Sequence, residues 1–467
     1  MRNEYDIVVI GSGPGGYVAA IRASQLGYKV AIIEKYPFLG GTCTNVGCIP
    51  SKALLDSSEH FYNAREVLNH HGVDPGKIQL NFQKMIARKD KVVKTNNEGL
   101  AFLMKKNKID VYQGVGVLAS DKMVEVRNAT GKIILITNYI ILATGSKPAS
   151  LPGTDIDEQN ILSSTGALSL KNIPESLTVI GGGIIGVEMA SVYSRLGSKV
   201  RILEYSDALI PGMDRSLGKG LAVVLKKKGI NIHLDARVSG VSDAGQEVTV
   251  TWADRQGRIH ETGAEKVLVA VGRKPYTQGL GLEKLKIVTD ERGFITVNKR
   301  LQTSVPNIFA IGDVIGGQML AHKAEEEGIF VAEVIDGQKP HINYRNIPGV
   351  VYTWPEVASV GFTEEEIKKK EIPYRKGKFP FSALGRARAA AEEDGFVKVL
   401  ADTVHGEVLG VHILGARAAD LIAQAVVAME YEVRDIDMAT ISWAHPTFSE
   451  ALKEAYLASS GRGNINI

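Results

Sequence analysis

The chain holds two cysteines, and both lie in one glycine-rich segment, GGTCTNVGCIPSK, which spans residues 40–52. The ordinary structural role of such a pair, Cys43 and Cys48, is that of small buried side chains. A zinc site is disfavoured, because no further cysteine or histidine lies close by to complete four-coordination. A redox pair fits better, since CIPSKALLDSSEHF is typical of a helix start and Lys52 adds positive charge, and both features favour a thiolate. We therefore predict that the two thiols take part in disulfide exchange.

A second candidate reactive group is His445, in the C-terminal segment SWAHPTFSEALKEAYL. Thiol chemistry needs a base poised near neutral pH, and histidine is the natural choice. Glu450 is expected to orient the imidazole and to stabilise its charged form. The letters TFSE are also typical of a capping box, in which Thr447 and Glu450 cap the helix that follows. The two interpretations are compatible, because a capping glutamate can still contact the histidine.

Two copies of one sequence element are expected to position the thiols beside an electron carrier. The segments YDIVVIGSGPGGYVAAIRASQLGYKVAIIE and ESLTVIGGGIIGVEMASVYSRLGSKVRILE align at a constant offset of about 170 residues. Each consists of an apolar strand, a G-x-G-x-x-G turn, a helix and a second strand that ends in an acid, which is the dinucleotide-binding fingerprint. One copy alone is weak evidence for a dinucleotide site, because such glycines sometimes only permit close packing. Two matched copies predict two dinucleotide sites. The expected binding residues are Gly11, Gly13, Gly16 and Glu34 in the first copy, and Gly181, Gly183, Gly186 and Glu204 in the second.

The position of the cysteine pair and the acid of the second copy bear on the carriers. The pair follows shortly after Glu34, which leaves the thiols close to whatever the first site holds. A carboxylate such as Glu204 suits the free 2′-hydroxyl of NAD, whereas the 2′-phosphate of NADP calls for arginine. Arg201 lies nearby but earlier on the strand. We therefore expect NAD in the second copy. If the first copy holds FAD, electrons have a route from thiols to flavin to nicotinamide.

Length and charge exclude several classes of protein. A chain of 467 residues is too long for one core and should divide into two to four domains. The net charge of +3, with basic and acidic residues interspersed, argues against nucleic acid or an anionic membrane as the main partner. No apolar run reaches the roughly 18 residues of a membrane-spanning helix. The N-terminus enters a strand almost at once, which leaves no room for a signal peptide, so we expect a cytoplasmic protein in a reducing compartment.

Further segments fix the fold class as α/β, with two Rossmann-like dinucleotide-binding domains and a C-terminal α+β domain. IILATGSKP and VLVAVGRKP are each typical of a buried strand that ends in a glycine turn, and they should close the two nucleotide-binding regions. NIFAIGDVIGG is another apolar strand, and it runs into Gly312 and Asp313. FVKVLADTVHGEVLGVHILG alternates across a glycine-containing turn and predicts a hairpin.

Taken together, these motifs resemble the flavoprotein disulfide reductases, which are class I of the pyridine nucleotide-disulfide oxidoreductases, and within them the dihydrolipoamide dehydrogenase branch. The resemblance covers essentially the whole chain. The cysteine segment and the HPT-x-SE motif are highly specific to this group, and the ending CIPSKALL points to the lipoamide branch. The remaining motifs occur in the expected order, including GGGIIGVEMASVYSRLG, IFAIGDV and MLAHKAEEEG.

The resemblance implies a role for each matching residue. Cys43 would exchange with the substrate dithiol, and Cys48 would lie against the flavin. Lys52 would lie near the reactive nitrogen of the flavin, paired with Glu188. The remaining implied contacts are Gly116, Asp313 and Ala321 with FAD, and Val238 and Gly272 with NAD. The C-terminal domain would form a homodimer and deliver His445, with Glu450, to the cysteines of the partner subunit.

The implied domains are an FAD-binding domain in two parts, 1–149 and 277–345, an NAD-binding domain over 150–276 and a dimerisation domain over 346–467. The implied reaction oxidises protein-bound dihydrolipoamide to lipoamide and reduces NAD⁺ to NADH. In that role the chain would be the E3 component of 2-oxo acid dehydrogenase complexes, and its partners would be lipoyl domains and E2 cores.

Two alternatives stay open. Glutathione and mercuric reductases share the cysteine segment, but Glu204 opposes the NADPH that glutathione reductases use, and the tail ASSGRGNINI lacks the extra cysteines of mercuric reductases. A non-catalytic flavin- and NAD-binding scaffold is less favoured, because the cysteine pair, His445 and Glu450 are all intact.

Overall fold

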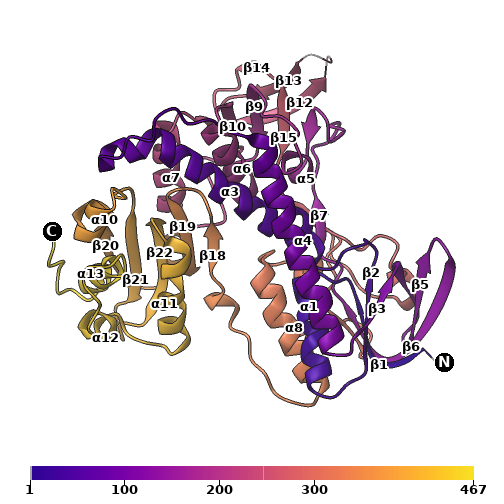
Figure 1. Cartoon of the computed structure of the whole chain (residues 1–467). Coiled ribbons are helices and arrows are strands. Elements are labelled where there is room, and N and C mark those ends of the chain that lie inside the picture. Colours follow the sequence, from indigo (N-terminus) through magenta and orange to yellow (C-terminus); the bar gives the residue numbers. More distant parts are fainter. Residues whose placement is uncertain (1–2, 244, 246) are drawn as a thin grey trace. The chain divides into compact units, whose positions relative to one another are not determined.

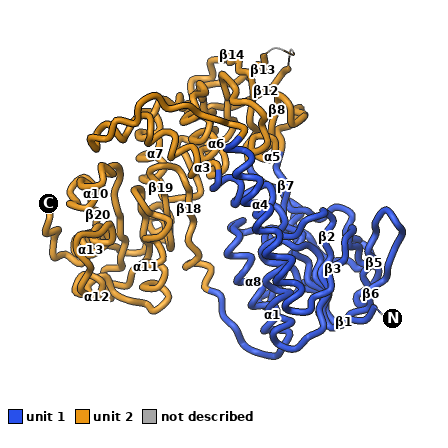
Figure 2. Tube along the Cα trace, viewed as in Figure 1, with its two compact units in different colours: residues 1–53, 84–149, 272–342 blue, residues 54–83, 150–271, 343–467 orange. Residues whose placement is uncertain are grey.

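The computed structural model describes residues 3–243, 245 and 247–467, and it divides into two compact units (Figure 2). Unit 1 comprises Met1–Ala53, Lys84–Ala149 and Gly272–Ile342. Unit 2 comprises Leu54–Gln83, Ser150–Val271 and Asn343–Ile467. These units are defined by packing, so the boundaries of the cofactor-binding domains remain a prediction.

A seven-stranded sheet forms the centre of unit 1, with the strand order β3-β2-β1-β6-β5-β4 and with β17 also paired to β6. The central strand β1 pairs in parallel with β2 and β6, so that Ile7 lies opposite Val30 and Tyr139. Its apolar run is continuous because both faces of the strand are covered, as is usual for parallel strands. The strands are β1 (Glu4–Ile10), β2 (Val30–Glu34), β3 (Asp110–Gln113), β4 (Val115–Ser120), β5 (Met123–Asn128), β6 (Gly131–Leu142) and β17 (Ile308–Ala310).

Helices α1 (Pro14–Gln25) and α8 (Ala321–Ile335) lie side by side in unit 1 (Figure 1). Their close approach depends on Gly15, because a Cβ there would lie 2.8 Å from the carbonyl oxygen of Ala324. Alternate residues of β1 enter different cores, since Ile7 and Val9 pack with these helices while Val8 and Ile10 pack with the opposite face of the sheet. The other elements that concern the site are α2 (Gly41–Val46), α3 (Cys48–Tyr62), α4 (Phe82–Lys106), β7 (Ser146–Pro148), β16 (Arg273–Pro275) and the 3₁₀ turn η4 (Gly312–Ile315).

A second parallel sheet, in unit 2, repeats this design with the strand order β11-β10-β9-β15-β8. Its central strand β9 is followed by α6 (Ile184–Arg195), just as β1 is followed by α1. The strands are β8 (Ile161–Leu162), β9 (Ser176–Ile180), β10 (Lys199–Leu203), β11 (Asn231–His233) and β15 (Lys266–Val269). The same unit contains α5 (Ser164–Ala167), α7 (Arg215–Lys227) and an antiparallel sheet of β12 (Arg237–Asp243), β13 (Val248–Ala253) and β14 (Ile259–Ala264).

The C-terminal part of unit 2 is an antiparallel sheet with the strand order β18-β19-β22-β21-β20. Strands β21 and β22 form the hairpin that the sequence predicts, and Phe396 lies opposite Leu414. The strands are β18 (Gly349–Val351), β19 (Glu356–Gly361), β20 (Tyr374–Pro380), β21 (Phe396–Asp402) and β22 (Val408–Gly415). The helices are α9 (Glu364–Lys369), α10 (Gly385–Ala389), α11 (Ala418–Glu430), α12 (Asp435–Thr440) and α13 (Glu450–Ser459).

The α/β class, with two Rossmann-like regions and a C-terminal α+β region, is therefore confirmed. Among the residues that the structure describes, no helix combines the length and apolarity that crossing a membrane requires.

Candidate active site

The two glycine loops have nearly the same geometry. Gly11 and Gly181 have φ values of +101° and +107°, which a side chain would rarely adopt. A Cβ on either residue would lie 2.4 Å from a carbonyl oxygen of the neighbouring strand end, that of Ala143 or of Ala270. Gly16 and Gly186 close each turn, because a Cβ there would lie 1.9 Å or 2.0 Å from the carbonyl oxygen of the first glycine. The sequence repeat is thus a repeat of backbone structure.

Each loop leaves room for a pyrophosphate at the start of a helix. Gly13 and Gly183 are the N-cap residues of α1 and α6, and neither helix start is capped by a side chain. A Cβ built on either glycine meets no atom within 4 Å. Open space in front of uncapped amides at a helix N-terminus is the arrangement that binds phosphate groups, so both loops fit a dinucleotide.

The acid of each fingerprint is held against its own loop. Glu34 Oε2 accepts hydrogen bonds from the backbone nitrogen and hydroxyl of Ser12, at 3.1 Å and 2.6 Å. Glu204 Oε2 accepts a hydrogen bond from the backbone nitrogen of Gly182 at 2.5 Å, and its Oε1 accepts one from Ser206 at 2.7 Å. Both carboxylates are buried and fixed beside the glycines, where the ribose of a bound dinucleotide lies. Both serines were missed in the sequence, where Ser12 is an x position of the first motif and Ser206 lies two residues beyond Glu204.

Two helices meet at the cysteine pair. Cys43 lies inside the short helix α2 and is partly buried, whereas Cys48 is the exposed first residue of α3. The helix start predicted at Cys48 is therefore confirmed, but Cys43 lies in a helix rather than in an open turn. Both residues are thiols in this structure. Gly40 makes the entry to α2 possible through its φ of +94°, at a position where a Cβ would lie 2.5 Å from Thr44.

The surroundings of Cys43 disfavour a thiolate on this residue. A hydrogen bond with Cys48 is the largest cause that raises the pKa of the Cys43 thiol, and burial and the charge of Glu325 add to it. Lys52 lowers the same pKa but does not outweigh these causes. Cys43 therefore holds its proton and shares it with the sulfur of Cys48. A helix N-terminus and one lysine do not decide the protonation of a buried thiol that has a sulfur neighbour.

Tyr17 and Glu325 extend the environment of Cys43 and were missed in the sequence analysis. The Tyr17 hydroxyl on α1 donates a hydrogen bond of 3.1 Å to Glu325 Oε1 on α8, and both side chains interact electrostatically with Cys43. Burial is the largest cause that raises the pKa of Tyr17, and the charge of Glu325 adds to it. The letters AHKAEEEG contain the signal, but only the packing of α8 against α1 shows which glutamate faces the thiol.

Asp313 belongs to a polar cluster at the end of β6. Ser146 donates a hydrogen bond of 2.5 Å to Asp313 Oδ2. Arg273 Nε donates to the Ser146 hydroxyl at 2.7 Å and lies 3.8 Å from Asp313 Oδ2. Burial lowers the pKa of Arg273, while the charges of Asp313 and Cys48 raise it. Ser146 and Arg273 lie in the glycine turns of ATGSKP and AVGRKP, which were interpreted only as strand ends.

In unit 2, His445 and Glu450 are in direct contact. His445 Nδ1 lies 2.8 Å from Glu450 Oε1, and the His445 side chain is 78% exposed. Glu450 Oε2 accepts a hydrogen bond from the backbone nitrogen of Thr447 at 2.9 Å. Helix α13 begins at Glu450 with Ser449 as its N-cap, so the capping box expected at Thr447 does not form. Instead the Thr447 hydroxyl donates to the carbonyl oxygen of Ala444.

The remaining candidates lie on defined elements, and their roles stay predictions. Gly116 is buried on β4, where a Cβ would lie 2.9 Å from Cγ2 of Ile10. Glu188 is buried on α6 and accepts a hydrogen bond from the backbone nitrogen of Tyr352 at 3.0 Å. The other four are Lys52 in the first turn of α3, Ala321 at the start of α8, Val238 on β12 and Gly272, which has a φ of +124° at the start of the last segment of unit 1.

Comparison with known proteins gives two family matches. Residues 5–328 match the pyridine nucleotide-disulphide oxidoreductases, and residues 347–456 match the dimerisation domain of that family.

Similar relatives and solved structures cover almost the whole chain. A mitochondrial dihydrolipoyl dehydrogenase 2 of Arabidopsis thaliana is 48% identical over 98% of this chain and 90% of its own length. A dihydrolipoyl dehydrogenase of Cupriavidus necator is 44% identical over 99% of both chains. Among solved structures, the Cu(II) complex of the HOCl-induced flavoprotein disulfide reductase RclA from Escherichia coli has a TM-score of 0.87 at 29% identity, over 97% of this chain and 99% of its own.

Proposed function

Because the chain belongs to the pyridine nucleotide-disulphide oxidoreductase family, we propose that it oxidises protein-bound dihydrolipoamide to lipoamide and reduces NAD⁺ to NADH. The observation that carries this proposal is the Cys43 thiol hydrogen-bonded to Cys48, in the same unit as the first dinucleotide loop. Relatives that bear the name dihydrolipoyl dehydrogenase, at 44% and 48% identity, support the choice of substrate.

The chain is an FAD- and NAD-dependent enzyme, and we assign FAD to the first glycine loop and NAD to the second. FAD bound at the first loop would supply the two-electron chemistry that links the dithiol to NAD⁺. Lys52 and Asp313 would lie along the flavin, and Glu188 would hold Lys52. The residues that would hold FAD are Gly11, Gly13, Gly16, Glu34, Gly116, Asp313 and Ala321, and those that would hold NAD are Gly181, Gly183, Gly186, Glu204, Val238 and Gly272.

The proton transfers in the disulfide exchange follow from the proton that Cys43 holds in the reduced cysteine pair. In the oxidised enzyme Cys43 and Cys48 form a disulfide, and His445 takes a proton from one thiol of the substrate. That substrate thiolate attacks the Cys43 sulfur, the disulfide bond breaks and Cys48 leaves as a thiolate. The second substrate sulfur loses its proton to Cys43 as it closes the ring of lipoamide, which releases Cys43 as a thiol. The hydrogen bond with Cys48, which raises the pKa of the Cys43 thiol, supports this order of steps.

We further propose that the enzyme is a cytoplasmic homodimer and the E3 component of a 2-oxo acid dehydrogenase complex, where lipoyl domains and an E2 core are its partners. The match of residues 347–456 to a dimerisation domain supports the homodimer. In that assembly His445, held by Glu450, would act on the cysteines of the partner subunit. The high exposure of His445 within one chain supports this role.

The test of the function is NADH formation from NAD⁺ and dihydrolipoamide by the FAD-loaded protein. NADPH with oxidised glutathione is assayed in parallel. We expect rapid NADH formation, and complete loss of it in C43S and C48S with flavin still bound. Reduction of glutathione by NADPH without lipoamide turnover would contradict the proposal and favour a glutathione-reductase-like enzyme.

A further inference from the structure

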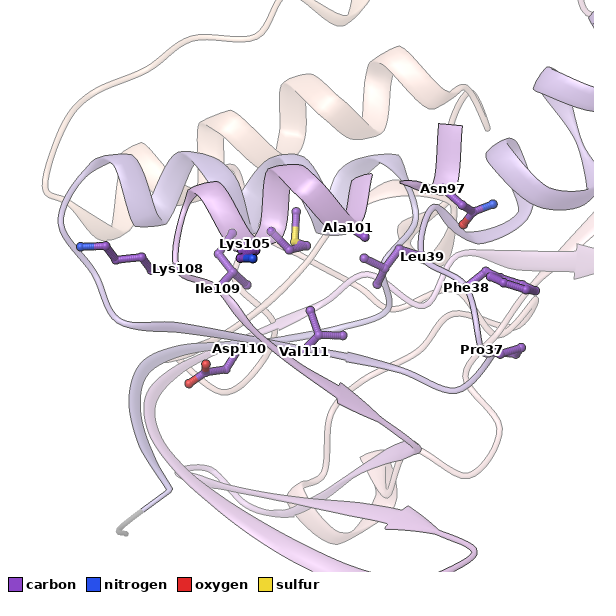
Figure 3. A pocket seen from close by; sticks show the side chains of 11 residues that line it. Pro37, Phe38, Leu39, Asn97, Ala101, Lys105, Lys108, Ile109, Asp110 and Val111 are labelled. Carbon is purple, nitrogen blue, oxygen red and sulfur yellow. The ribbon is translucent and has the colours of Figure 1, made fainter. Parts of the chain in front are cut away.

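A pocket of about 570 Å³ opens on unit 1 between the loop after β2, the C-terminal half of α4 and β3 (Figure 3). Its walls are mostly apolar. Two cationic side chains, Lys105 and Lys108, and the carboxylate of Asp110 also line it. A volume of this size is typical of sites for small organic ligands. The pocket includes none of the residues assigned above to dinucleotide binding or to thiol chemistry. The lining side chains on which the argument depends are Phe38, Leu39, Asn97, Ala101, Lys105 and Val111.

One buried polar group in this pocket lacks a hydrogen-bond partner. Asn97 is 8% exposed, and its Nδ2 donates to Asn45 Oδ1 at 2.9 Å and to the carbonyl oxygen of Val93 at 3.1 Å. Its Oδ1 is buried and accepts no hydrogen bond from the described residues. In Figure 3 this oxygen points toward the labelled Phe38 and Leu39, whereas the nitrogen points away from them. A buried carbonyl oxygen without a donor is unfavourable, so this site calls for a donor from a ligand.

The orientation of the Asn97 amide is fixed by its neighbour. Asn45 Nδ2 donates to the carbonyl oxygens of Leu39 and Gly41, at 2.8 Å and 2.9 Å, so Asn45 presents its oxygen to Asn97. Asn97 must therefore present its nitrogen to Asn45, since a flipped amide would place two oxygens together. The flipped orientation of the Asn97 amide is therefore excluded, and the Asn97 oxygen stays directed into the pocket.

We propose that this pocket binds a small organic anion whose aromatic ring carries an N–H donor. The ring lies against Leu39, Ala101 and Val111, and the exposed ring of Phe38 flanks it. The N–H donates to Asn97 Oδ1, and the anionic group pairs with Lys105. The Asp110 carboxylate, which accepts a hydrogen bond from the Tyr5 hydroxyl at 2.8 Å, lies at the far end and disfavours a second anionic group there.

The pocket is connected to the cysteine pair through short contacts. Asn45 lies in α2, two residues after Cys43, and Asn97 holds it from α4. Leu100 on α4 lies close to the start of α2, as a Cβ built on Gly40 would be 2.8 Å from Leu100 Cδ1. A ligand on Asn97 would therefore restrict α2 as well as occupy the pocket. This inference goes beyond the proposed function and does not depend on lipoamide as the substrate.

The experiment is a calorimetric titration of the FAD-loaded, full-length protein with indole-3-acetate and with benzofuran-3-acetate, in which a ring oxygen replaces the N–H. We expect indole-3-acetate to bind at least tenfold more tightly than benzofuran-3-acetate. The substitution K105Q should weaken the binding of indole-3-acetate at least fivefold. Lys106 is an exposed neighbour outside the pocket, so K106Q should change the affinity less than twofold. A101M, which fills the pocket from the exposed side of α4, should abolish binding.

Hydrogen exchange gives a second readout. With indole-3-acetate bound, we expect amide exchange over residues 39–46 to slow at least threefold in the parent protein and not in A101M. Three outcomes would each overturn the proposal. They are equal affinity for the two probes, unchanged binding in A101M, and no binding of either probe at 10 mM. A dissociation constant above 10 mM would be on the order of 10²-fold weaker than that of an ordinary small-molecule site.

Discussion

At the scale of single residues, the reactivity of Cys43 depends on neighbours that are distant in sequence. The hydrogen bond with Cys48, burial and the charge of Glu325 all raise the pKa of this thiol, and Lys52 opposes them. Glu325 is held by the hydroxyl of Tyr17. This arrangement keeps the proton on Cys43, and the charge of Glu325 is the part of it that a single substitution removes.

The first prediction concerns that charge. Replacing Glu325 by glutamine removes a group that raises the pKa of Cys43, so the pKa should fall and the thiolate should be more populated at any pH below it. We expect Cys43 of the reduced E325Q enzyme to be alkylated by iodoacetamide about tenfold faster than Cys43 of the parent at pH 7, with label on Cys43 resolved from label on Cys48 by peptide mass spectrometry. A tenfold change corresponds to a decrease of roughly one pKa unit.

E326Q is the matched control, because Glu326 lies next in sequence on α8 and is exposed. Its rate of alkylation should match that of the parent. An E325Q rate equal to that of E326Q would show that the carboxylate does not act on the thiol.

A second prediction at this scale concerns His445. With its Nδ1 held 2.8 Å from Glu450, the imidazole can take a proton at Nε2. Loss of a general base costs about 10²- to 10⁴-fold in rate, so H445Q should lose that much kcat for dihydrolipoamide. Oxidation of NADH with ferricyanide as the electron acceptor needs no thiol base and should stay within about twofold of the parent. Equal loss of both activities would place the defect in folding or in cofactor binding.

At the scale of elements, a buried charged cluster joins α7 to the C-terminal sheet of unit 2. Lys398 Nζ on β21 lies 2.7 Å from both carboxylate oxygens of Asp214, the N-cap of α7, and 3.0 Å from Glu364 Oε2. His412 on β22 lies beside them, fully buried, with Nδ1 2.8 Å from the Ser359 hydroxyl. The Asp214 carboxylate also accepts a hydrogen bond from the backbone nitrogen of Glu364 at 3.0 Å. Charge and backbone contacts together fix the nucleotide-binding part of unit 2 to its C-terminal part.

The third prediction is a pH dependence of stability from this cluster. The pKa of His412 is lowered from 6.5 to about 4, because burial, with a smaller contribution from Lys398, outweighs the opposing effects of Asp214 and Glu364. The unfolded chain therefore takes up a proton on this residue at a higher pH than the folded protein does. The neutral, buried imidazole makes its full contribution to the free energy of unfolding above pH 6.5. This contribution decreases as the pH falls from 6.5 to about 4. The full shift corresponds to roughly 3 kcal/mol.

The measurement is the thermal midpoint of the FAD-loaded protein between pH 7.5 and pH 4.5, for the parent and for H412Q. We expect the thermal midpoint of the parent to fall further than that of H412Q over this range. The midpoint of H412Q at pH 7.5 should be lower than that of the parent, because the substitution disturbs the contact with Ser359. Parallel pH profiles of the two proteins would show that His412 does not titrate in this window.

At the scale of the whole molecule, the match to a dimerisation domain over residues 347–456 raises the question of which subunit supplies the histidine. Proteins with C43S alone or H445Q alone should each be inactive with dihydrolipoamide. A heterodimer of the two chains has one site with both groups intact if His445 acts across the interface, and it has none if His445 acts within its own chain.

The fourth prediction follows from this count. Random pairing of the two chains makes half of the dimers mixed, and each mixed dimer has one intact site out of two, so co-expressed C43S and H445Q chains should show about a quarter of the parent activity. The measurement is lipoamide turnover per bound flavin in the whole pool of co-expressed dimers. Selection of the mixed dimers on two different tags should raise this value to about half of the parent activity. Activity no higher than that of the single variants would contradict a site shared between subunits.

The sequence by itself determined the parts of this protein that depend on local chemistry. The two glycine fingerprints, the acids that end them and the helix start at Cys48 are each properties of a short segment, because turn geometry and strand or helix patterns need no distant partner. The hairpin of β21 and β22 was predicted for the same reason, and the α/β class followed from the repeated units.

Tertiary structure decided the properties that arise between segments. The pKa of Cys43 depends on Glu325, which is 282 positions away in the chain (43 to 325) and reaches the thiol only because Gly15 lets α8 pack against α1. Ser146 and Arg273 likewise meet Asp313 only because β7 pairs with β16. The unpartnered oxygen of Asn97 is visible only once α4 covers the loop after β2. Burial and electrostatic interactions act through space, so sequence spacing does not show them.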